Sequence, residues 1–411
     1  MLILGNVLFI NYMGEGHINP TIGLVQELIA RGESITYYTS QIYKEKIEKT
    51  GATVRVISEK AQKILFEFVT KLMSQGRNLD QFNKNRFKLF EIMEWITDEI
   101  LDEIRLESYD YVIYDAMSLP GKWIAEIRQL PTVCTWSTFA SNKESDLFKK
   151  RLKKQGSAIL KALDGRKEEM EAFKARLEQK YGISIQPFPQ AVMDEADINI
   201  VFTSKYFQLE SATFKENFLF VGPSMIDRQD QGDFPLDRLK DSAVVYMALG
   251  TIANKRPDLY KACLEGLNDF DGTVVLGIGN QLSISELGSV PDHFIIRNYI
   301  PQLDVLRYSD AFITHCGMNS TSEALYFGTP LVMLPLMNDQ PIVANRVKEL
   351  GAGVILDHET LNAEKLREAV IEVLQNPIYK QNSEKISQSF RKSGGCARAA
   401  DELLSRIKQF V

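Results

Sequence analysis

Residues 311–346 read AFITHCGMNSTSEALYFGTPLVMLPLMNDQPIVANR, and this stretch decides the fold. The apolar run 311–314 predicts a buried parallel strand, and the polar residues from Asn319 onward predict the first turn of a helix. His315 and Gly317 then lie in a strand-to-helix turn. Such a turn directs backbone N–H groups and the positive end of a helix dipole at one point, which suits a phosphate or diphosphate.

A second predicted strand, 330–334, delivers Asp339 and Gln340 to the same edge of the sheet. We interpret the whole stretch as half of a nucleotide-sugar site. Glu323 has a second interpretation, because Ser320-Thr-Ser-Glu323 also fits a capping box in which Glu323 only satisfies a backbone N–H. The residues alone leave both uses open.

Length and composition limit the class of protein. At 411 residues the chain predicts two domains of roughly 200 residues each. Hydrophobic residues make up 45% and charged residues 25%, which is typical of a globular protein, and the net charge of -6 argues against a nucleic-acid partner. The four cysteines form no CxxC pair, so we expect reduced thiols in a cytoplasm and no zinc site.

The N-terminal residues predict a βαβ unit. The run 7–11 reads as a strand without a preceding Lys or Arg, so we expect no exported leader. A helix is expected from Asn19-Pro20 to Arg31, and the next strand at 34–39. The glycines before His17 do not form GxGxxG, so no dinucleotide is implied. His17 follows a strand, where α/β sheets place their ligands, or it is a solvated residue beside a helix start.

Asp115 ends another predicted buried strand, 109–115. A carboxylate there can fix the tautomer of a histidine and stabilise its imidazolium, or it can cap the following helix. Residues 59–107 predict helices whose spaced apolar residues, including Phe66 and Trp95, are mostly one face packed on the core. Residues 143–181 predict a pair of solvated charged helices. No run of about 20 apolar residues occurs, so no membrane span is expected.

A second α/β unit begins with the predicted strand 243–249, followed by Gly250-Thr251 in a turn. The stretch 224–241 lacks periodicity and reads as a linker. Asp269-Phe-Asp271 matches a metal-binding DxD motif, but it precedes a strand, outside the predicted site, and we interpret it as a loop.

The order of these residues resembles the donor-binding box of inverting UDP-sugar glycosyltransferases, closest to the bacterial macrolide and flavonoid branch. The matching elements are Tyr299-Ile-Pro-Gln302, His315-Cys-Gly, Asn319-Ser320, Glu323, Gly328-x-Pro330, Pro335 and Asp339-Gln340. Gly14-x-Gly16-His17-x-x-Pro20 resembles the segment that carries the family's catalytic base. The resemblance runs nearly end to end.

This resemblance implies a GT-B fold, an α/β architecture of two Rossmann-like domains facing across a cleft. We expect an acceptor-binding domain at 1–223, the linker at 224–241 and a nucleotide-sugar-binding domain at 242–378. Helices at 379–411 would follow, the last crossing back onto the first domain.

It also implies roles for individual residues. His17 would be the catalytic base, Asp115 its partner, and Phe139 part of the acceptor pocket. The donor would be held by the uracil contacts Tyr299 and Ile300, the ribose contacts Gln302 and Glu323, the diphosphate contacts Thr251, His315, Gly317, Asn319 and Ser320, and the sugar contacts Asp339 and Gln340.

The implied activity is transfer of a hexose, glucose by analogy with Gln340, from a UDP-sugar to a hydroxyl of a hydrophobic small molecule such as a flavonoid, other phenol or macrolide. The product would be a β-glycoside. No metal or other cofactor is expected, and the protein would act as a monomer. Plant members of the family have tryptophan at the positions of Met318 and Tyr299. At Met318 only the backbone would be needed at the phosphate, whereas the smaller stacking face of Tyr299 leaves the choice between UDP and TDP donors open. A UDP-sugar epimerase and a non-catalytic nucleotide-sugar sensor are the alternatives.

Overall fold

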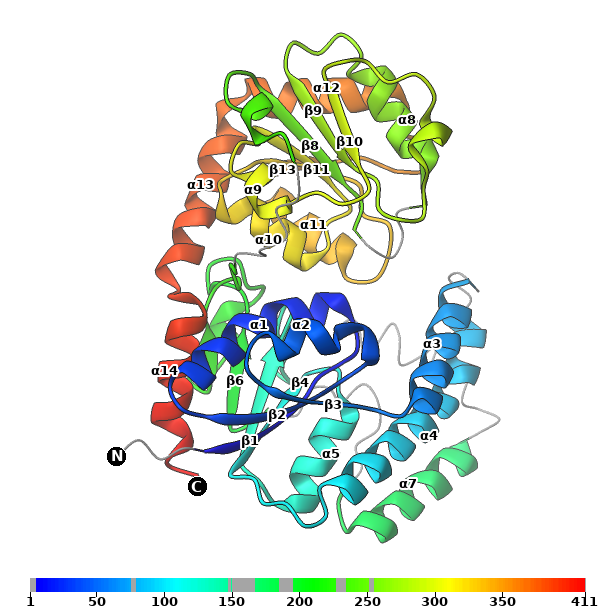
Figure 1. Cartoon of the computed structure of the whole chain (residues 1–411), viewed down its shortest axis with the longest axis vertical. Coiled ribbons are helices and arrows are strands. Elements are labelled where there is room, and N and C mark those ends of the chain that lie inside the picture. The colour runs from blue at the N-terminus through cyan, green and yellow to red at the C-terminus, as the bar shows by residue number, and fades with distance from the viewer. Residues whose placement is uncertain are drawn as a thin grey trace. The chain divides into compact units, whose positions relative to one another are not determined.

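The computed structural model describes residues 5–74, 79–146, 149, 167–184, 195–226, 234–250 and 255–410. These residues form two compact units (Figure 1). Unit 1 comprises residues 1–202, 210–220 and 396–411, and unit 2 comprises 203–209 and 221–395. The prediction of two parallel-sheet α/β domains is confirmed.

Unit 1 is built on a seven-stranded parallel sheet with the strand order β3-β2-β1-β4-β5-β6-β7. Apolar, mostly β-branched and aromatic runs form these strands because both faces of the sheet are covered. The strands are β1 (Asn6–Ile10), β2 (Ser34–Thr39), β3 (Thr53–Val56), β4 (Tyr111–Asp115), β5 (Thr132–Trp136), β6 (Ile198–Val201) and β7 (Phe218–Phe220).

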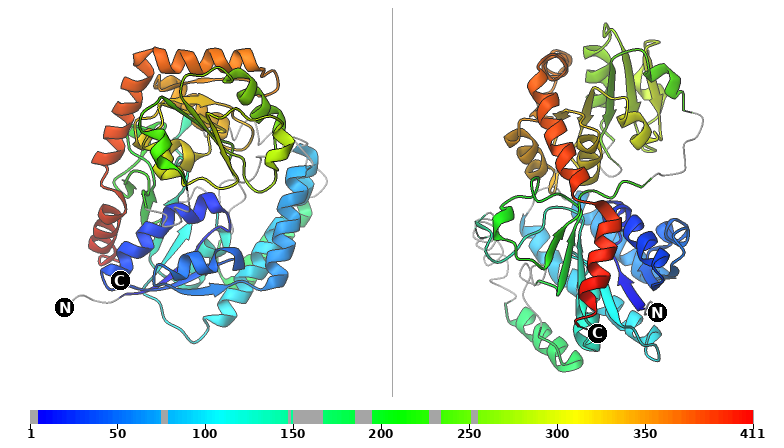
Figure 2. Two further views of the ribbon diagram at one scale, coloured as in Figure 1. Left: turned by 45° about the horizontal axis from the view of Figure 1, so that its top comes forward. Right: turned by 90° about the vertical axis from the view of Figure 1, so that its left-hand side faces the viewer.

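The helices of unit 1 cover its sheet. They are α1 (Glu15–Ala30), α2 (Lys44–Glu48), α3 (Glu59–Ser74), α4 (Leu79–Glu103), α5 (Leu119–Arg128), α7 (Lys167–Tyr181) and α14 (Gly395–Ile407). Short 3-10 turns occur at Gln41–Tyr43 and Ser211–Thr213. Figure 2 shows α14 alongside the strands at the β7 edge of the sheet, where Arg406 and Arg398 donate to the carbonyls of Glu216 and Phe220.

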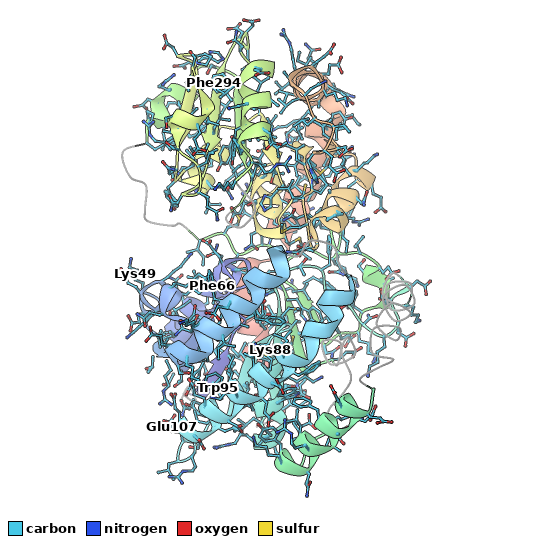
Figure 3. All side chains as sticks on the ribbon, turned by 90° about the vertical axis from the view of Figure 1, so that its right-hand side faces the viewer. Lys49, Phe66, Lys88, Trp95, Glu107 and Phe294 are labelled. Atoms are coloured by element: carbon cyan, nitrogen blue, oxygen red, sulfur yellow. The ribbon has the colours of Figure 1, made fainter. Side chains whose placement is uncertain are left out.

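Two sequence expectations for unit 1 were wrong in detail. Helix α1 begins at Glu15, one turn before the predicted start, because Gly14 is extended and its carbonyl accepts from the amides of His17 and Ile18. Pro20 therefore lies inside the helix. Phe66 does not pack on the core: 72% of its surface is exposed, since Leu65 and Phe68 take the inward face of α3 (Figure 3).

Unit 2 repeats the same arrangement with six parallel strands in the order β10-β9-β8-β11-β12-β13. The strands are β8 (Val244–Ala248), β9 (Thr273–Gly277), β10 (Phe294–Arg297), β11 (Ala311–Thr314), β12 (Leu331–Met333) and β13 (Gly353–Ile355). Both units thus have the strand order 3-2-1-4-5-6 of a doubly wound sheet, extended by one strand in unit 1.

The helices of unit 2 flank its sheet. They are α8 (Pro257–Gly266), α9 (Gln302–Leu306), α10 (Met318–Tyr326), α11 (Gln340–Glu349), α12 (Ala363–Gln375) and α13 (Pro377–Lys392). Short 3-10 turns occur at Leu236–Leu239 and Ile284–Leu287. The first of these lies in the predicted linker, yet Leu239 is buried in unit 2. Within the described ranges, no helix is long and apolar enough to cross a membrane.

Gly121 marks the closest approach of a helix to the sheet of unit 1. A Cβ at this position would lie 2.5 Å from Cβ of Tyr114 and 3.3 Å from the carbonyl oxygen of Ile10. We predict that Gly121→Ala lowers the free energy of unfolding by about 1–3 kcal/mol, because α5 cannot move without disturbing β1 and β4. Urea unfolding would measure the change.

Gly16→Ala is the matched control, because a Cβ on Gly16 meets no atom within 4 Å in the described structure. Replacing this helical glycine by alanine should raise the free energy of unfolding by about 0.5–1 kcal/mol. Equal stability of Gly121→Ala and the wild type would contradict the close approach.

Candidate active site

The strand order of unit 1 reverses at β1, which has β2 on one side and β4 on the other. The parallel register pairs Ile10 with Tyr114, so the residues that follow, Asn11 and Asp115, emerge at the same level. The carboxyl edge at such a reversal is where open α/β sheets bind their ligands.

His17 and Asp115 meet at this edge. Nδ1 of His17 lies 2.9 Å from Oδ2 of Asp115, and the side chains are 24% and 1% exposed respectively. The other oxygen of Asp115 accepts from the backbone N–H of Met117 at 2.8 Å. Asp115 does not cap the next helix, because that position belongs to Ser118, whose hydroxyl accepts from Gly121. The alternative of a merely solvated His17 is excluded as well.

A buried polar cluster supports the turn that carries His17. The amide nitrogen of Asn11 donates to the carbonyl of His17 at 3.2 Å and contacts the hydroxyls of Thr21 and Tyr37. The ring of Tyr12 stands edge-on to the imidazole, with 4.8 Å between ring centroids. The imidazole is therefore held on two sides before any ligand arrives.

Ser137 is a site residue that the sequence analysis missed. Its Oγ lies 2.9 Å from Nδ1 of His17, the same nitrogen that faces Asp115. A carboxylate can only accept, so Nδ1 carries the proton and Nε2 presents a lone pair. The signal was available, because Ser137 directly follows β5, the neighbour of β4. Phe139, two residues further on, is half-buried in the same loop.

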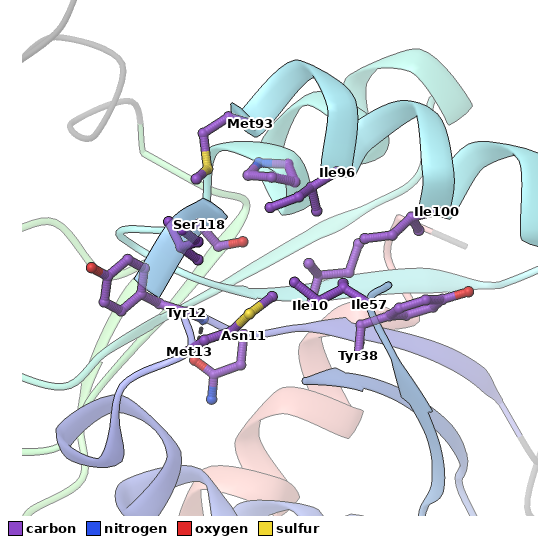
Figure 4. A pocket seen from close by; sticks show the side chains of 12 residues that line it. Ile10, Asn11, Tyr12, Met13, Tyr38, Ile57, Met93, Ile96, Ile100 and Ser118 are labelled. Atoms are coloured by element: carbon purple, nitrogen blue, oxygen red, sulfur yellow. Dashed lines mark hydrogen bonds between the residues drawn. The ribbon is translucent and has the colours of Figure 1, made fainter. Parts of the chain in front are cut away.

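An apolar pocket opens beside this turn, within unit 1 (Figure 4). Side chains from β1, α3 and α4 converge on it, and Tyr12 and Ser118 add polar groups to its wall. The lining residues are Ile10, Asn11, Tyr12, Met13, Tyr38, Ile57, Leu65, Met93, Ile96, Ile100, Ser118 and Pro120. Phe139 is not among them. The lining is mostly apolar, as in sites that bind hydrophobic small molecules.

Unit 2 has an equivalent reversal at β8, between β9 and β11. Ala248 pairs with Thr314, so Gly250 and His315 follow at adjacent positions of the edge. A Cβ on Gly250 or on Gly317 would lie 2.5 or 2.6 Å from Nε2 of His315. The two glycines therefore make room for this ring. Thr251, predicted beside them, lies outside the described residues.

Burial lowers the pKa of His315 to about 4, although the backbone of Ala248 and the charge of Asp339 act in the opposite direction. Its Nδ1 is buried and has no hydrogen-bond partner among the described residues. The ring is thus neutral at pH 7. It adds no full positive charge to the site.

Helix α10 begins directly after this histidine. Its N-cap is Gly317, which has no side chain to accept from the first turn of the helix. Cys316 has φ +66°, a conformation that residues other than glycine rarely adopt. Strain of this kind concentrates at binding sites, and here it precedes a helix start suited to an anion.

Glu323 lies in the middle of α10 and is 4% exposed. The capping-box interpretation is wrong, because the N-cap is Gly317 and Ser320 is already inside the helix. Instead, Oε2 of Glu323 accepts from the amide nitrogen of Gln302 at 2.5 Å. The amide oxygen of Gln302 accepts from the hydroxyl of Tyr246 at 3.1 Å. The sequence analysis missed Tyr246 because it lies inside a buried strand.

The remaining predicted donor residues also lie at the carboxyl edge. Tyr299 follows β10 and is 59% exposed, whereas its neighbour Ile300 is buried. Asp339 is the N-cap residue of α11. Gln340 is buried, and its side-chain oxygen accepts from the backbone N–H groups of Leu336 and Met337 at 2.8 Å each. These two bonds use the side-chain oxygen, so the amide N–H groups are the part of the Gln340 side chain that can bind a ligand.

Asp269 and Asp271 are exposed and precede β9, at the opposite edge of the sheet from His315. Among the described residues, no three His, Cys, Asp or Glu side chains gather closely enough to hold a metal ion.

Comparison with known proteins adds an independent observation. A family model described as UDP-glucoronosyl and UDP-glucosyl transferase matches residues 186–393. The Bacillus subtilis protein described as uncharacterized UDP-glucosyltransferase YojK is 38% identical over 408 residues, which is 99% of this chain and 98% of that protein. The NDP-glycosyltransferase YjiC of the same organism is 32% identical over 98% of each chain. The crystal structure of CalG4, the calicheamicin glycosyltransferase, matches with a TM-score of 0.85 at 29% identity over 99% of both chains.

The neutral state of His315 predicts a pH dependence of stability. The unfolded state takes up a proton on this histidine below its ordinary pKa of 6.5, whereas the folded state stays neutral down to about pH 4. Stability is therefore fully present above pH 6.5 and falls as the pH drops toward 4, with a slope of at most about 1.4 kcal/mol per pH unit from this group.

Urea unfolding of the wild type and of His315→Asn at several pH values would measure this slope. We expect the variant to lose less stability between pH 6.5 and 4, and the two proteins to differ by a constant amount above pH 7. Parallel curves across the whole range would contradict the shifted pKa.

Proposed function

The chain belongs to the UDP-glucoronosyl and UDP-glucosyl transferase family, and we propose that it moves glucose from UDP-glucose to a hydroxyl of a hydrophobic small molecule, with inversion at the anomeric carbon. Membership makes it a glycosyltransferase, and the GT-B fold predicted from the sequence is confirmed. The observation that carries the proposal is the pairing of His17 with the buried Asp115 in a chain of this family.

Unit 2 supplies the groups for the donor. The first turn of α10 would hold the diphosphate through its backbone N–H groups and the helix dipole. The exposed ring of Tyr299 would stack on the uracil, with the backbone of Ile300 at its edge. Glu323, supported by Gln302, would accept from the ribose hydroxyls. Asp339 and the amide N–H groups of Gln340 would bind the hexose hydroxyls, a pattern that favours glucose.

Unit 1 supplies the groups for the acceptor. Its apolar pocket suits a phenol, flavonoid or macrolide-like ring system, and the similarity to a protein described as calicheamicin glycosyltransferase supports such an acceptor. The imidazole of His17, with its proton held on Nδ1 by Asp115, directs a basic Nε2 away from the carboxylate.

The reaction then follows from these groups. Nε2 of His17 removes the proton from the acceptor hydroxyl while the oxygen of that hydroxyl attacks the anomeric carbon of the sugar. The bond from that carbon to the diphosphate breaks as the new bond forms, and UDP leaves with the electron pair. Helix α10 stabilises the negative charge of UDP, and Asp115 stabilises the imidazolium. A single displacement converts the α-linked donor into a β-glycoside.

Incubation with UDP-glucose, with and without a phenolic acceptor such as a flavonoid, tests the proposal. Release of UDP that depends on the acceptor, together with a β-glucoside in the product, is the expected result. Conversion of the hexose without an acceptor would indicate an epimerase. Binding of UDP-glucose with no turnover across a panel of phenols and macrolides would indicate a sensor.

His17 and Asp115 should act as one unit. We predict that His17→Ala lowers the rate of transfer to weakly acidic alcohols by about 10²- to 10⁴-fold, because that is the usual contribution of general-base assistance. Asp115→Ala should also be slow, and the double variant barely slower than His17→Ala. Steady-state rates of UDP release would give these values.

Two controls accompany this prediction. Affinity for UDP, measured by calorimetry, should stay unchanged in His17→Ala, because the donor groups belong to unit 2. Thiols and acidic phenols, which ionise without much assistance, should lose less rate than alcohols. Near-normal transfer to an alcohol by His17→Ala would assign the base to another residue.

We further predict that transfer needs no metal ion, since backbone N–H groups and the helix dipole would balance the diphosphate charge. Activity should persist in excess EDTA, and manganese should add nothing. Asp269→Asn with Asp271→Asn is the matched variant for the DxD-like sequence and should keep the wild-type rate within about twofold, which is about 0.4 kcal/mol. Loss of activity in EDTA that manganese restores would refute this prediction.

A further inference from the structure

We propose that Tyr246 is a positioning residue through which unit 2 distinguishes a ribonucleoside diphosphate from its 2′-deoxy counterpart. The proposal rests on the proposed function, because it concerns the ribose of the UDP donor. It adds a residue and a selectivity that neither the sequence pattern nor the similarity to known transferases assigns to this chain.

Tyr246 begins a continuous chain of hydrogen bonds. Its hydroxyl donates to the amide oxygen of Gln302 at 3.1 Å. The amide nitrogen of Gln302 then donates to Oε2 of Glu323 at 2.5 Å and to Oγ of Ser320 at 3.3 Å. The three partners of Gln302 come from two elements, one from β8 and two from α10.

The donor and acceptor groups of the Gln302 amide give this chain of hydrogen bonds a direction. A glutamine side chain has two N–H donors, and both are used here within the protein. Its oxygen faces the phenol, so the nitrogen must face the carboxylate. Gln302 therefore acts on a ligand by holding Glu323, while Glu323 makes the contact. This differs from the sequence expectation that Gln302 itself binds the ribose.

The phenol is a rigid anchor for the chain. Tyr246 is buried in the middle of β8, and its ring stacks on Phe312 of the neighbouring strand with centroids 4.8 Å apart and planes inclined by 21°. Since burial and stacking restrict the ring, its hydroxyl holds the amide oxygen of Gln302 in one position. The carboxylate of Glu323 is thereby located relative to the sheet as well as to its own helix.

A carboxylate that is held in one position can distinguish a ribose, which has two neighbouring hydroxyls, from a 2′-deoxyribose, which has one. The 2′- and 3′-hydroxyls of ribose can both donate to one carboxylate, but only if its oxygens have the correct position and tilt. A 2′-deoxyribose offers a single donor, which can follow a carboxylate that shifts. Loosening Gln302 should therefore weaken UDP binding more than dUDP binding.

The test is calorimetric titration of UDP and dUDP into the wild type and Tyr246→Phe. Both nucleotides carry uracil and a diphosphate, so their affinity ratio isolates the 2′-hydroxyl. We expect the wild type to prefer UDP. Tyr246→Phe should lose about three- to tenfold of its UDP affinity, the equivalent of one net hydrogen bond, and at most twofold for dUDP. The preference for UDP should shrink accordingly.

Tyr260→Phe is the matched control. Tyr260 is also buried in unit 2, but its hydroxyl donates to the carbonyl of Gly277 and not to Gln302. Any general loosening of the core should appear in both variants and act equally on the two nucleotides. The ratio of UDP to dUDP affinity should stay at the wild-type value in Tyr260→Phe.

A second pair of variants tests the route through Gln302. Gln302→Ala should itself reduce the preference for UDP, and adding Tyr246→Phe should reduce it no further, because the two residues lie on one path. A further loss in the double variant would overturn the proposed route.

The outcomes separate this inference from the proposed function. An unchanged affinity ratio in Tyr246→Phe, or a wild type that binds UDP and dUDP equally, overturns the inference and leaves UDP-sugar transfer intact. A wild type that binds neither nucleotide nor UDP-glucose overturns the proposed function, and the inference with it.

Discussion

Parallel strand pairing at the reversal of strand order is the constraint on which both halves of this protein depend. In unit 1, β1 pairs with β4, and in unit 2, β8 pairs with β11. In each pair the two strands end side by side, and the loops that follow them leave toward opposite faces of the sheet. His17 and Asp115 come together through the first pairing, and Gly250 and His315 through the second. A shift of either register would separate them.

Both sites also depend on a buried carboxylate that is held by a fixed partner. Asp115 is almost fully buried and faces an imidazole, and Glu323 is almost fully buried and faces an amide. A buried carboxylate is costly unless such partners satisfy it, so each one restricts the side chains around it to a single arrangement. The same arrangement orients the imidazole of His17 in unit 1 and the amide of Gln302 in unit 2.

Two local errors of sequence interpretation concern helices of unit 1. Asn19-Pro20 was taken as the start of a helix, yet Gly14 is the N-cap residue of α1. Gly14 is extended and lies shortly after β1, so the helix begins before Asn19 and its first turn lies at the sheet edge. Phe66 was assigned to the core because of its spacing from other apolar residues, but a helix face is narrower than that spacing suggests, and Leu65 and Phe68 already occupy it.

The sequence by itself determined the architecture and the family. Apolar runs followed by glycine, histidine or aspartate predicted the parallel strands and their functional ends, and the order of residues from Tyr299 to Gln340 indicated the family. Only the tertiary structure decided how those residues are used. Asp115 contacts His17 instead of capping a helix, and Glu323 accepts a hydrogen bond from the amide of Gln302. Ser137 contacts His17, and Tyr246 contacts Gln302. The reason is physical: hydrogen bonds between residues 98, 120 or 56 positions apart are created by strand register and ring packing. Local patterns carry no record of them.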